Sequence, residues 1–413
     1  MRTAAITGMG IVSCLGTDLA AVTLSLKNGQ SGIVCDEHRK ELGFKSPLAA
    51  LVPEVSAKDL NLSRKTLRTM CEPALYSIAA AKKAVADAGL LRNHIQNDRC
   101  GVIFGNDSTI KAGVESIDIA REYNETHYIG SGYIFRTLNS TITMNLAAYF
   151  GTRGANWTMS AACASGAHVI GQALMLIRSG MQDIIIAGGA QETNWMAMAS
   201  FDALNAFSSS VEPPTAASRP FDKNRNGLVP GGGGASIIIE ELDHALSRGA
   251  TIYGIVEGYG FSSSIGKTLS EPSAKGSVNA IKNALKDADI SPDKIDYINA
   301  HATSTLTGDL AEATAIHQVF GPETPVSSTK SMTGHECWMS GISEVIYTLL
   351  MAKNNFIAPN INFTGLSEGC PPIHVVPRTR PAKIRRALSN SFGFGGTNAA
   401  IALKINSDNE SDT

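Results

Sequence analysis

Short apolar runs alternate with helix-like segments along this chain, and the same order of elements occurs twice. In the first part, apolar periodicity predicts strands at residues 4–6, 101–105 and 183–187 and helices at residues 18–28 and 62–89. From residue 251 the order begins again, with a strand, the helix 277–288, the strand 295–299, the helix 342–352 and a last strand at 399–405. This alternation predicts two related α/β units, each with a sheet that helices cover on both faces.

The expected boundary divides the chain into units of residues 1–250 and 251–405. The polar and acidic tail at residues 406–413 is expected to be disordered. We expect the repeat in the order of the elements and not in residue identity.

Three stretches between these elements predict turns or irregular structure. The glycines at residues 8–10 and 188–190 predict tight turns after their strands. Residues 106–139 are polar and poorly periodic, which predicts irregular segments that cross a surface.

The composition excludes several classes of function. The chain has 35 Lys and Arg against 37 Asp and Glu, so no global positive field favours nucleic acid or an anionic membrane surface. No run of about 20 apolar residues predicts a membrane span. The seven cysteines are scattered, without the paired spacing of a zinc site. We therefore expect a cytoplasmic protein with reduced thiols, no bound metal and no cofactor.

One cysteine stands at a predicted strand-to-helix turn. Residues 159–166, MSAACASG, join an apolar run to a helix-like run and place Cys163 at the corner. Free backbone N–H groups at the start of a helix favour a thiolate, and the surrounding small residues leave room for a substrate. Cys163 is therefore a candidate nucleophile, although a buried structural cysteine is about equally compatible with this pattern.

Three more segments place reactive side chains on loops that follow predicted strands. They are residues 299–309 (NAHATSTLTGD), 327–335 (SSTKSMTGH) and 390–398 (NSFGFGGTN). A single histidine in such a loop is usually structural, but several reactive segments at strand ends favour a shared site.

The four motifs closely resemble those of β-ketoacyl-acyl carrier protein synthases of the elongating, Cys-His-His class, most of all the synthase I and II branch. The resemblance covers essentially the whole chain. It implies a thiolase-like fold, in which two duplicated halves form a five-layer α/β/α/β/α arrangement, and a homodimer. It also implies a decarboxylative condensation, in which an acyl group on the cysteine joins malonyl-acyl carrier protein to give a 3-oxoacyl product and CO2.

The resemblance assigns roles to the motif residues. The catalytic set is Cys163, His301, Lys330 and His335. The backbone N–H groups of Cys163 and Phe394 form an oxyanion hole, with Phe394 as a gate. Thr303 and Thr305 contact the phosphopantetheine arm, and Glu344 and Asp309 support the loops. An acidic acyl carrier protein docks on Arg64, Lys65 and Arg68, for which a solvated helix face is an equally good interpretation.

Departures from the family pattern concern the acyl group. Residues 336–341, ECWMSG, replace a stretch that is rich in glycine and alanine in the family, so Trp338 and Met339 add bulk near the site. Ser108, Phe201 and Leu228 stand where the family shapes its acyl pocket. The acyl preference is therefore open, while the reaction type is unaffected.

Three alternatives differ from a fatty acid synthase in substrate or role. A ketosynthase of a type II polyketide or aryl polyene pathway uses the same chemistry. A non-catalytic chain-length partner, which would form a heterodimer with a ketosynthase, typically lacks the nucleophile that this chain has. A thiolase is disfavoured because residues 390–398 contain no second cysteine to act as base.

Overall fold

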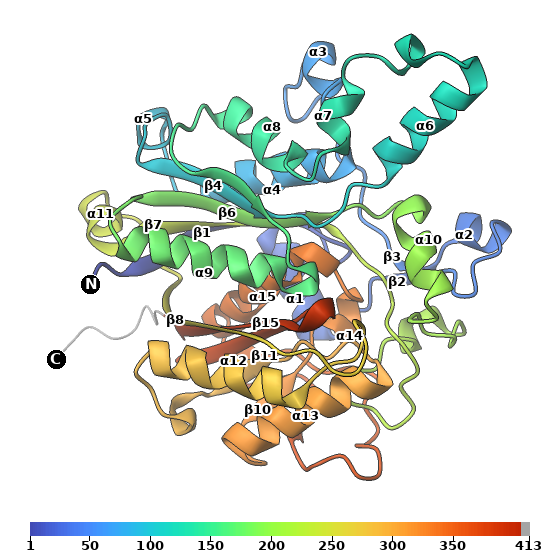
Figure 1. Ribbon diagram of the computed structural model, residues 1–413. Coiled ribbons are helices and arrows are strands. Elements are labelled where there is room, and N and C mark those ends of the chain that lie inside the picture. Colours follow the sequence, from blue (N-terminus) through green and yellow to red (C-terminus); the bar gives the residue numbers. More distant parts are fainter. Residues whose placement is uncertain (406–413) are drawn as a thin grey trace.

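The computed structural model describes residues 1–405, so the tail predicted to be disordered lies outside the described residues. Figure 1 shows five layers. Helices α9 (Ser165–Arg178) and α15 (Ser340–Lys353) lie between two sheets, and further helices cover the outer face of each sheet. This is the layered α/β arrangement that was predicted.

The first sheet contains the strands of the N-terminal half. Its spatial order is β1 (Ala4–Val12), β7 (Gly233–Glu241), β6 (Ile184–Gln191), β4 (Cys100–Gly105) and β5 (Asn156–Met159). The first two pairings are antiparallel and the last two are parallel. Strand β5 lies at the end of the sheet.

The second sheet repeats this topology with the strands of the C-terminal half. Its order is β8 (Gly254–Ser263), β15 (Thr397–Ile405), β14 (Arg386–Phe392), β9 (Tyr297–Asn299), β10 (Pro325–Ser327) and β12 (His374–Val375). Again two antiparallel pairings precede parallel ones. A short antiparallel pairing of β1 with β8 joins the two sheets.

The remaining elements cover the sheets or connect them. Between β1 and β4 lie α1 (Leu19–Asn28), β2 (Ile33–Cys35), α2 (Glu37–Glu41), β3 (Leu48–Ala50), α3 (Arg64–Leu67), α4 (Glu72–Asp87) and α5 (Arg92–Ile95). The rest of the N-terminal half contains α6 (Lys111–Tyr123), η1 (Thr126–Ile129), α7 (Tyr133–Thr137), α8 (Thr141–Phe150), η2 (Ala162–Ala164), α10 (Trp195–Ala203), η3 (Pro214–Ala216) and α11 (Leu242–Ser247). The C-terminal half contains α12 (Ala274–Asp287), η4 (Pro292–Lys294), α13 (Leu306–Phe320), α14 (Lys330–Thr333), η5 (Cys337–Met339), β11 (Phe356–Ile357), β13 (Arg380–Pro381) and η6 (Phe394–Gly396).

Burial explains why α9 and α15 form the middle layer. Both helices are apolar on most of their surface and belong to one core that reaches from β1 to β15. A helix that is apolar all round must be covered on all sides, and a position between two sheets provides that cover. In Figure 1 the outer helices α4 and α8 cover the first sheet, while α12 and α13 cover the second.

The duplication is also visible in residue identity, contrary to the sequence analysis. Strand β1 contains Gly8 and Gly10, and β8 contains Gly258 and Gly260 at the matching places. A Cβ on Gly8 would lie 2.3 Å from the Ala84 carbonyl oxygen in α4, and a Cβ on Gly258 would lie 2.3 Å from the Ala284 oxygen in α12. Each glycine pair therefore lets its strand approach an alanine-lined helix.

These contacts show why the predicted turns at residues 8–10 and 188–190 are wrong. Strands β1 and β6 run straight through both stretches. The glycines serve close packing of layers, a use that cannot be distinguished from a turn without knowing the neighbour.

Two further expectations need correction. Residues 106–139 are not irregular throughout, since they contain the helices α6 and α7. The predicted helix at 62–89 is interrupted. The short helix α3 ends at Leu67, and α4 begins only at Glu72, with Pro73 in the first turn of α4. Within residues 1–405, no helix combines the length and apolar character needed to cross a bilayer.

Candidate active site

The nucleophile elbow, residues 159–166, connects β5 to α9. Ala162 has the unusual φ of 46°, which turns the chain so that Cys163 stands at the corner. The Ser165 hydroxyl accepts a hydrogen bond from the Ala161 N–H at 2.9 Å and donates one to the Ala162 carbonyl at 2.6 Å. These bonds hold the turn, and Cys163 itself is only 6% exposed.

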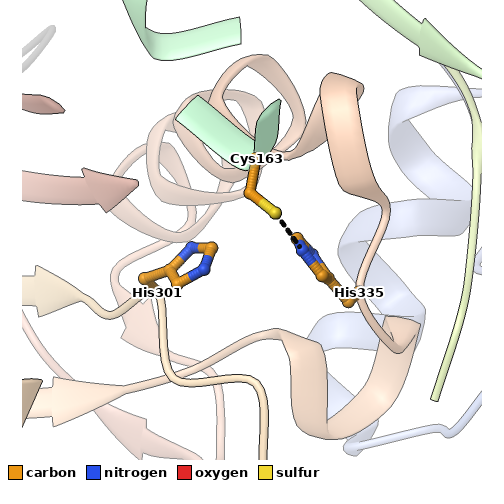
Figure 2. A group of neighbouring side chains, drawn as sticks. All are labelled: Cys163, His301 and His335. Carbon is orange, nitrogen blue, oxygen red and sulfur yellow. Dashed lines mark hydrogen bonds between the residues drawn. The ribbon is translucent and has the colours of Figure 1, made fainter. Parts of the chain in front are cut away.

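Both histidines of the predicted set lie beside this cysteine. Figure 2 shows His301 and His335 on either side of Cys163, and the sulfur lies 3.0 Å from Nε2 of His335. One nitrogen of each ring and the sulfur all lie within 4.8 Å of one another. The two rings meet edge to face with centroids 5.3 Å apart. The structure thus brings together side chains from residues 163, 301 and 335.

The predicted preference of Cys163 for the thiolate form is wrong for the free protein, because the side chain is buried. Removal from water raises the pKa of Cys163 to about 12, because burial penalises the charged form. The Lys330 charge and the backbone N–H groups of Phe394 and Cys163 act in the opposite direction. The free protein therefore holds a neutral thiol, and the groups that favour the thiolate become important when the sulfur reacts.

Both imidazoles are neutral for a related reason. Burial lowers the pKa of His301 and of His335 well below the usual value, and the nearby Lys330 lowers both further. Nδ1 of His335 lies 3.3 Å from the Ser340 hydroxyl. If that hydroxyl donates to Nδ1, the ring proton of His335 is on Nε2 and faces the sulfur.

Lys330 begins α14 and is paired inside the protein. Its ammonium group donates to Oε1 of Glu344 on α15, and both side chains are almost completely buried. Burial raises the pKa of Glu344 to about 7, while Lys330 lowers it. The ion pair with Glu344 fixes the position of the Lys330 ammonium group, whose charge lowers the pKa of both histidines.

The His301 loop is held by two carboxylates of α13. Asp309 accepts the Thr303 N–H at 3.0 Å. Glu312 accepts the N–H groups of His301 and Ala302 at 2.9 and 2.6 Å. Sequence reasoning missed Glu312, although an acidic residue one helical turn after Asp309 was a usable signal.

A cavity of about 310 Å³ opens at the cysteine. Its lining includes Cys163, both histidines, Thr303, Thr305, Phe394, Phe201 and Leu228. Ser108, which was predicted beside the acyl group, follows β4, is half-buried and does not line this cavity. The Thr303 and Thr305 hydroxyls lie 3.1 Å apart.

The predicted carrier-docking residues lie on another part of the surface. Arg64 and Lys65 belong to α3 and Arg68 caps it, and all three are exposed. None of them forms an ion pair with a described residue. Arg136 adds a fourth cation because its Nε donates to the Arg68 carbonyl at 2.9 Å.

Comparison with known proteins identifies the class that this fold and site define. The N-terminal domain of β-ketoacyl synthases matches residues 1–245, and the C-terminal domain of these enzymes matches residues 253–364. The chain therefore belongs to the β-ketoacyl synthase family of acyltransferases, as the motifs predicted.

Individual relatives cover nearly the full length. The chain is 41% identical over 408 residues to 3-oxoacyl-acyl-carrier-protein synthase 1 of Haemophilus influenzae, covering 98% of this chain and 99% of that protein. A β-ketoacyl synthase structure from Burkholderia phymatum matches with a TM-score of 0.93 and 33% identity, covering 98% of this chain and 100% of the other. A type II polyketide ketosynthase in complex with its acyl carrier protein matches with a TM-score of 0.88 and 29% identity, covering 98% and 100%. The thiolase-like fold predicted from the motifs is confirmed.

Proposed function

We propose that this protein is a 3-oxoacyl-acyl carrier protein synthase that condenses a Cys163-bound acyl group with malonyl-acyl carrier protein. The observation that carries the proposal is the 3.0 Å contact between the Cys163 sulfur and His335, with His301 close by. A nucleophile between two neutral imidazoles suits a reaction that first needs a thiolate and then needs two hydrogen-bond donors.

In the first step, the acyl group moves from the carrier to the enzyme. The Cys163 sulfur forms a bond to the thioester carbonyl, the bond from that carbon to the carrier sulfur breaks, and the cysteine proton ends on the departing carrier thiol. We assign the backbone N–H groups of Cys163 and Phe394 to the developing oxyanion, because both already interact with the Cys163 sulfur. Nε2–H of His335 donates to the attacking sulfur, which lowers the energy of its ionised form.

In the second step, malonyl thioester loses CO2 and the remaining electron pair gives an enolate. His301 and His335 donate hydrogen bonds to the thioester oxygen, where the enolate charge gathers. The nucleophilic carbon attacks the acyl carbonyl, the bond to Cys163 breaks, and the released thiolate takes a proton from solvent. Lys330 supports this step by keeping both imidazoles neutral, since its charge opposes their protonation.

The substrate reaches the cysteine through the 310 Å³ cavity. We assign the Thr303 and Thr305 hydroxyls to the pantetheine arm, because both line this cavity and their backbone is fixed by α13. The exposed cations Arg64, Lys65 and Arg68 suit an acidic carrier protein, since they have no carboxylate partner of their own among the described residues.

The sheet edge supports a homodimer. Strand β5 is the last strand of its sheet, and its Trp157 is 40% exposed. An exposed edge strand with an apolar side chain favours pairing with another strand, and a second copy of β5 would supply one. A heterodimer with a ketosynthase-like partner would use the same edge, and sedimentation of the purified protein separates the two cases.

Seven free thiols fit a reducing, cytoplasmic location.

Among the alternatives, a non-catalytic chain-length partner is disfavoured because residues 163, 301, 330 and 335 are all present and gathered at one place. A type II polyketide or aryl polyene ketosynthase would use the same residues, and only the acyl group distinguishes it. Trp338, which is buried against Cys163, is the observation that keeps this candidate open.

The decisive test measures whether an acyl group becomes attached to Cys163. Intact-protein mass spectrometry after incubation with acyl carrier protein should show one acyl group on the native enzyme and none on Cys163→Ala. Condensation with malonyl-acyl carrier protein should fall by at least about 10⁴-fold in the variant, because the acyl-enzyme cannot form. Condensation at the native rate by Cys163→Ala would refute the proposal.

A further inference from the structure

A second elbow in the C-terminal half repeats the backbone of the nucleophile elbow. We define the second elbow as residues 335–341, which lead through η5 into α15. Cys337 has a φ of 46°, the same value as Ala162, and each is the first residue of a 3-10 turn that leads into a helix beginning with Ser-Gly. In this correspondence, Trp338 takes the place of Cys163.

The two elbows lie against each other in the middle layer. A Cβ on Gly341 would lie 2.2 Å from the Ala167 nitrogen, and a Cβ on Gly166 would lie 3.1 Å from the Trp338 carbonyl oxygen. The backbones of the two elbows are therefore in direct contact. Cys163 of the N-terminal half reaches the histidine loops of the C-terminal half, and by the same geometry Trp338 reaches into the N-terminal half.

The contacts of Trp338 agree with this placement. Its side chain is 5% exposed and forms a buried cluster with Cys163 and Cys337. Its ring lies 6.4 Å from that of Phe201 in α10, an element of the N-terminal half. Its carbonyl oxygen lies 2.8 Å from the Cβ position of Gly189 in β6. The indole thus stands directly beside the nucleophile, against residues of the N-terminal half.

The reaction requires the acyl chain to occupy this region. Both substrates meet at Cys163, and the carrier arm enters past Thr303 and Thr305 of the C-terminal half, which line the cavity together with Phe201 and Leu228 of the N-terminal half. The acyl chain of the acyl-enzyme must leave that channel free for the second carrier. We therefore place it toward Phe201, which lines the same cavity and whose ring centroid lies 6.4 Å from that of Trp338.

We propose that Trp338 is a specificity-determining residue that restricts the acyl group on Cys163 to short chains by filling space on the acyl side of the sulfur. This inference rests on the proposed function and adds the substrate class to it. The indole Nε1 is buried and has no hydrogen-bond partner. The ring is therefore held by packing alone, and its volume, rather than a polar contact, sets the limit.

The test compares which chains load onto the cysteine. The native enzyme and its Trp338 variants are incubated with acyl carrier protein carrying straight chains from butanoyl to hexadecanoyl, offered singly and in competition. Loading is read by intact-protein mass spectrometry. Trp338→Ala should increase the loading of long chains relative to butanoyl by about tenfold or more, because one methylene in an apolar pocket already changes discrimination by about that factor.

Two further variants make the result interpretable. Trp338→Phe is the graded comparison, since it keeps an aromatic ring, loses no hydrogen bond and removes the least volume, and it should shift the profile less than Trp338→Leu or Trp338→Ala does. Trp338→Leu is a milder reduction in volume for the case that Trp338→Ala does not fold, and thermal unfolding checks both. An unchanged profile in a folded Ala or Leu variant would overturn the inference, as would a native enzyme that accepts hexadecanoyl as readily as butanoyl. Absence of any acyl group on Cys163 would instead refute the proposed function itself.

Discussion

The two elbows share a backbone but differ in what they carry. The nucleophile elbow surrounds Cys163 with small residues, and its partner carries Glu336, Cys337, Trp338 and Met339 at the matching places. The N-terminal half therefore supplies the nucleophile and the space beside it. The C-terminal half supplies both histidines and fills its own corner with an indole. A duplicated fold permits the two elbows to differ in this way. One elbow is enough to carry the nucleophile, so the residue at the matching place in the other can instead limit the space for the substrate.

The two elbows also differ in the buried charges around them. Around the second elbow lie Lys330, Glu336 and Glu344, all at most 2% exposed, whereas the nucleophile elbow holds no ionisable side chain except Cys163. The Lys330–Glu344 pair is a fixed dipole next to the imidazoles. The half that contains both histidines thus also contains the Lys330 charge, which adds to burial in lowering their pKa values.

The largest effect is expected from the two histidines, and it should separate their roles. His301→Ala and His335→Ala should each slow condensation by about a hundredfold or more, because each removes one donor to the enolate oxygen. Only His335 contacts the Cys163 sulfur, at 3.0 Å, so only His335→Ala should also slow acyl loading. Single-turnover mass spectrometry of loading, followed by a condensation assay, measures the two steps separately.

The two substitutions serve as controls for each other, since both create a similar loss of volume. Equal loading rates in the two variants would show that the contact between His335 and the sulfur has no part in acyl transfer. A loading defect confined to His301→Ala would reverse the assignment of the two rings.

The sequence predicted the residues whose chemistry demands a particular type. Cys163, His301, Lys330 and His335 stand in recognisable motifs, and the structure brings Cys163 and the two histidines together, with Lys330 near enough for its charge to lower the pKa of His301. Glu312 was missed because its spacing from Asp309 indicates only a shared helix face, while the backbone N–H groups that it accepts belong to a loop that folds against that face.

Other features depend on contacts between segments that are distant in the sequence, and a local sequence pattern does not reveal such contacts. Gly8 and Gly258 resemble turn glycines until the helices α4 and α12 are seen against them. The state of Cys163 was misjudged for the same kind of reason, since its place at a helix start is visible in sequence and its burial is not. Trp338 was recognised as added bulk, but its correspondence to Cys163 required the backbone of both elbows.

The second elbow should also make stability depend on pH. Glu336 accepts hydrogen bonds from Ser343 and Tyr347, at 2.6 and 2.9 Å, and burial raises its pKa to about 7. A carboxyl whose folded pKa lies above the unfolded value of about 4.5 binds its proton more tightly in the folded state. The protonated Glu336 therefore adds to the free energy of unfolding below about pH 4.5, and this contribution is lost as pH rises to about 7.

The native protein should lose up to about 3 kcal/mol of its free energy of unfolding over this range through Glu336, and Glu336→Gln should abolish that loss.

Urea unfolding of both proteins between pH 5 and pH 8 measures the difference in stability. Glu312 and Glu344, whose pKa values are also raised to about 7, are present in both proteins, so their contributions largely cancel. The variant should gain stability relative to the native protein as pH rises. A difference that stays constant over this range would mean that Glu336 is ionised throughout, with Lys330 as its counter-charge.

The smallest effect tests the duplication itself. Gly8→Ala and Gly258→Ala each place a methyl group 2.3 Å from a helix carbonyl, that of Ala84 in α4 and that of Ala284 in α12. Overpacking against backbone should cost about 1–3 kcal/mol in each case, because a main chain can give way less easily than a side chain.

Gly113→Ala is the control, since Gly113 lies in α6 with no atom within 4 Å of its Cβ position, and it should leave stability unchanged or raise it by about 0.5–1 kcal/mol. Urea unfolding should give similar losses for the two strand glycines if the layers of both halves are packed by the same rule. A loss at one glycine only would show that the repeat is kept in topology while the packing of the two outer layers has diverged.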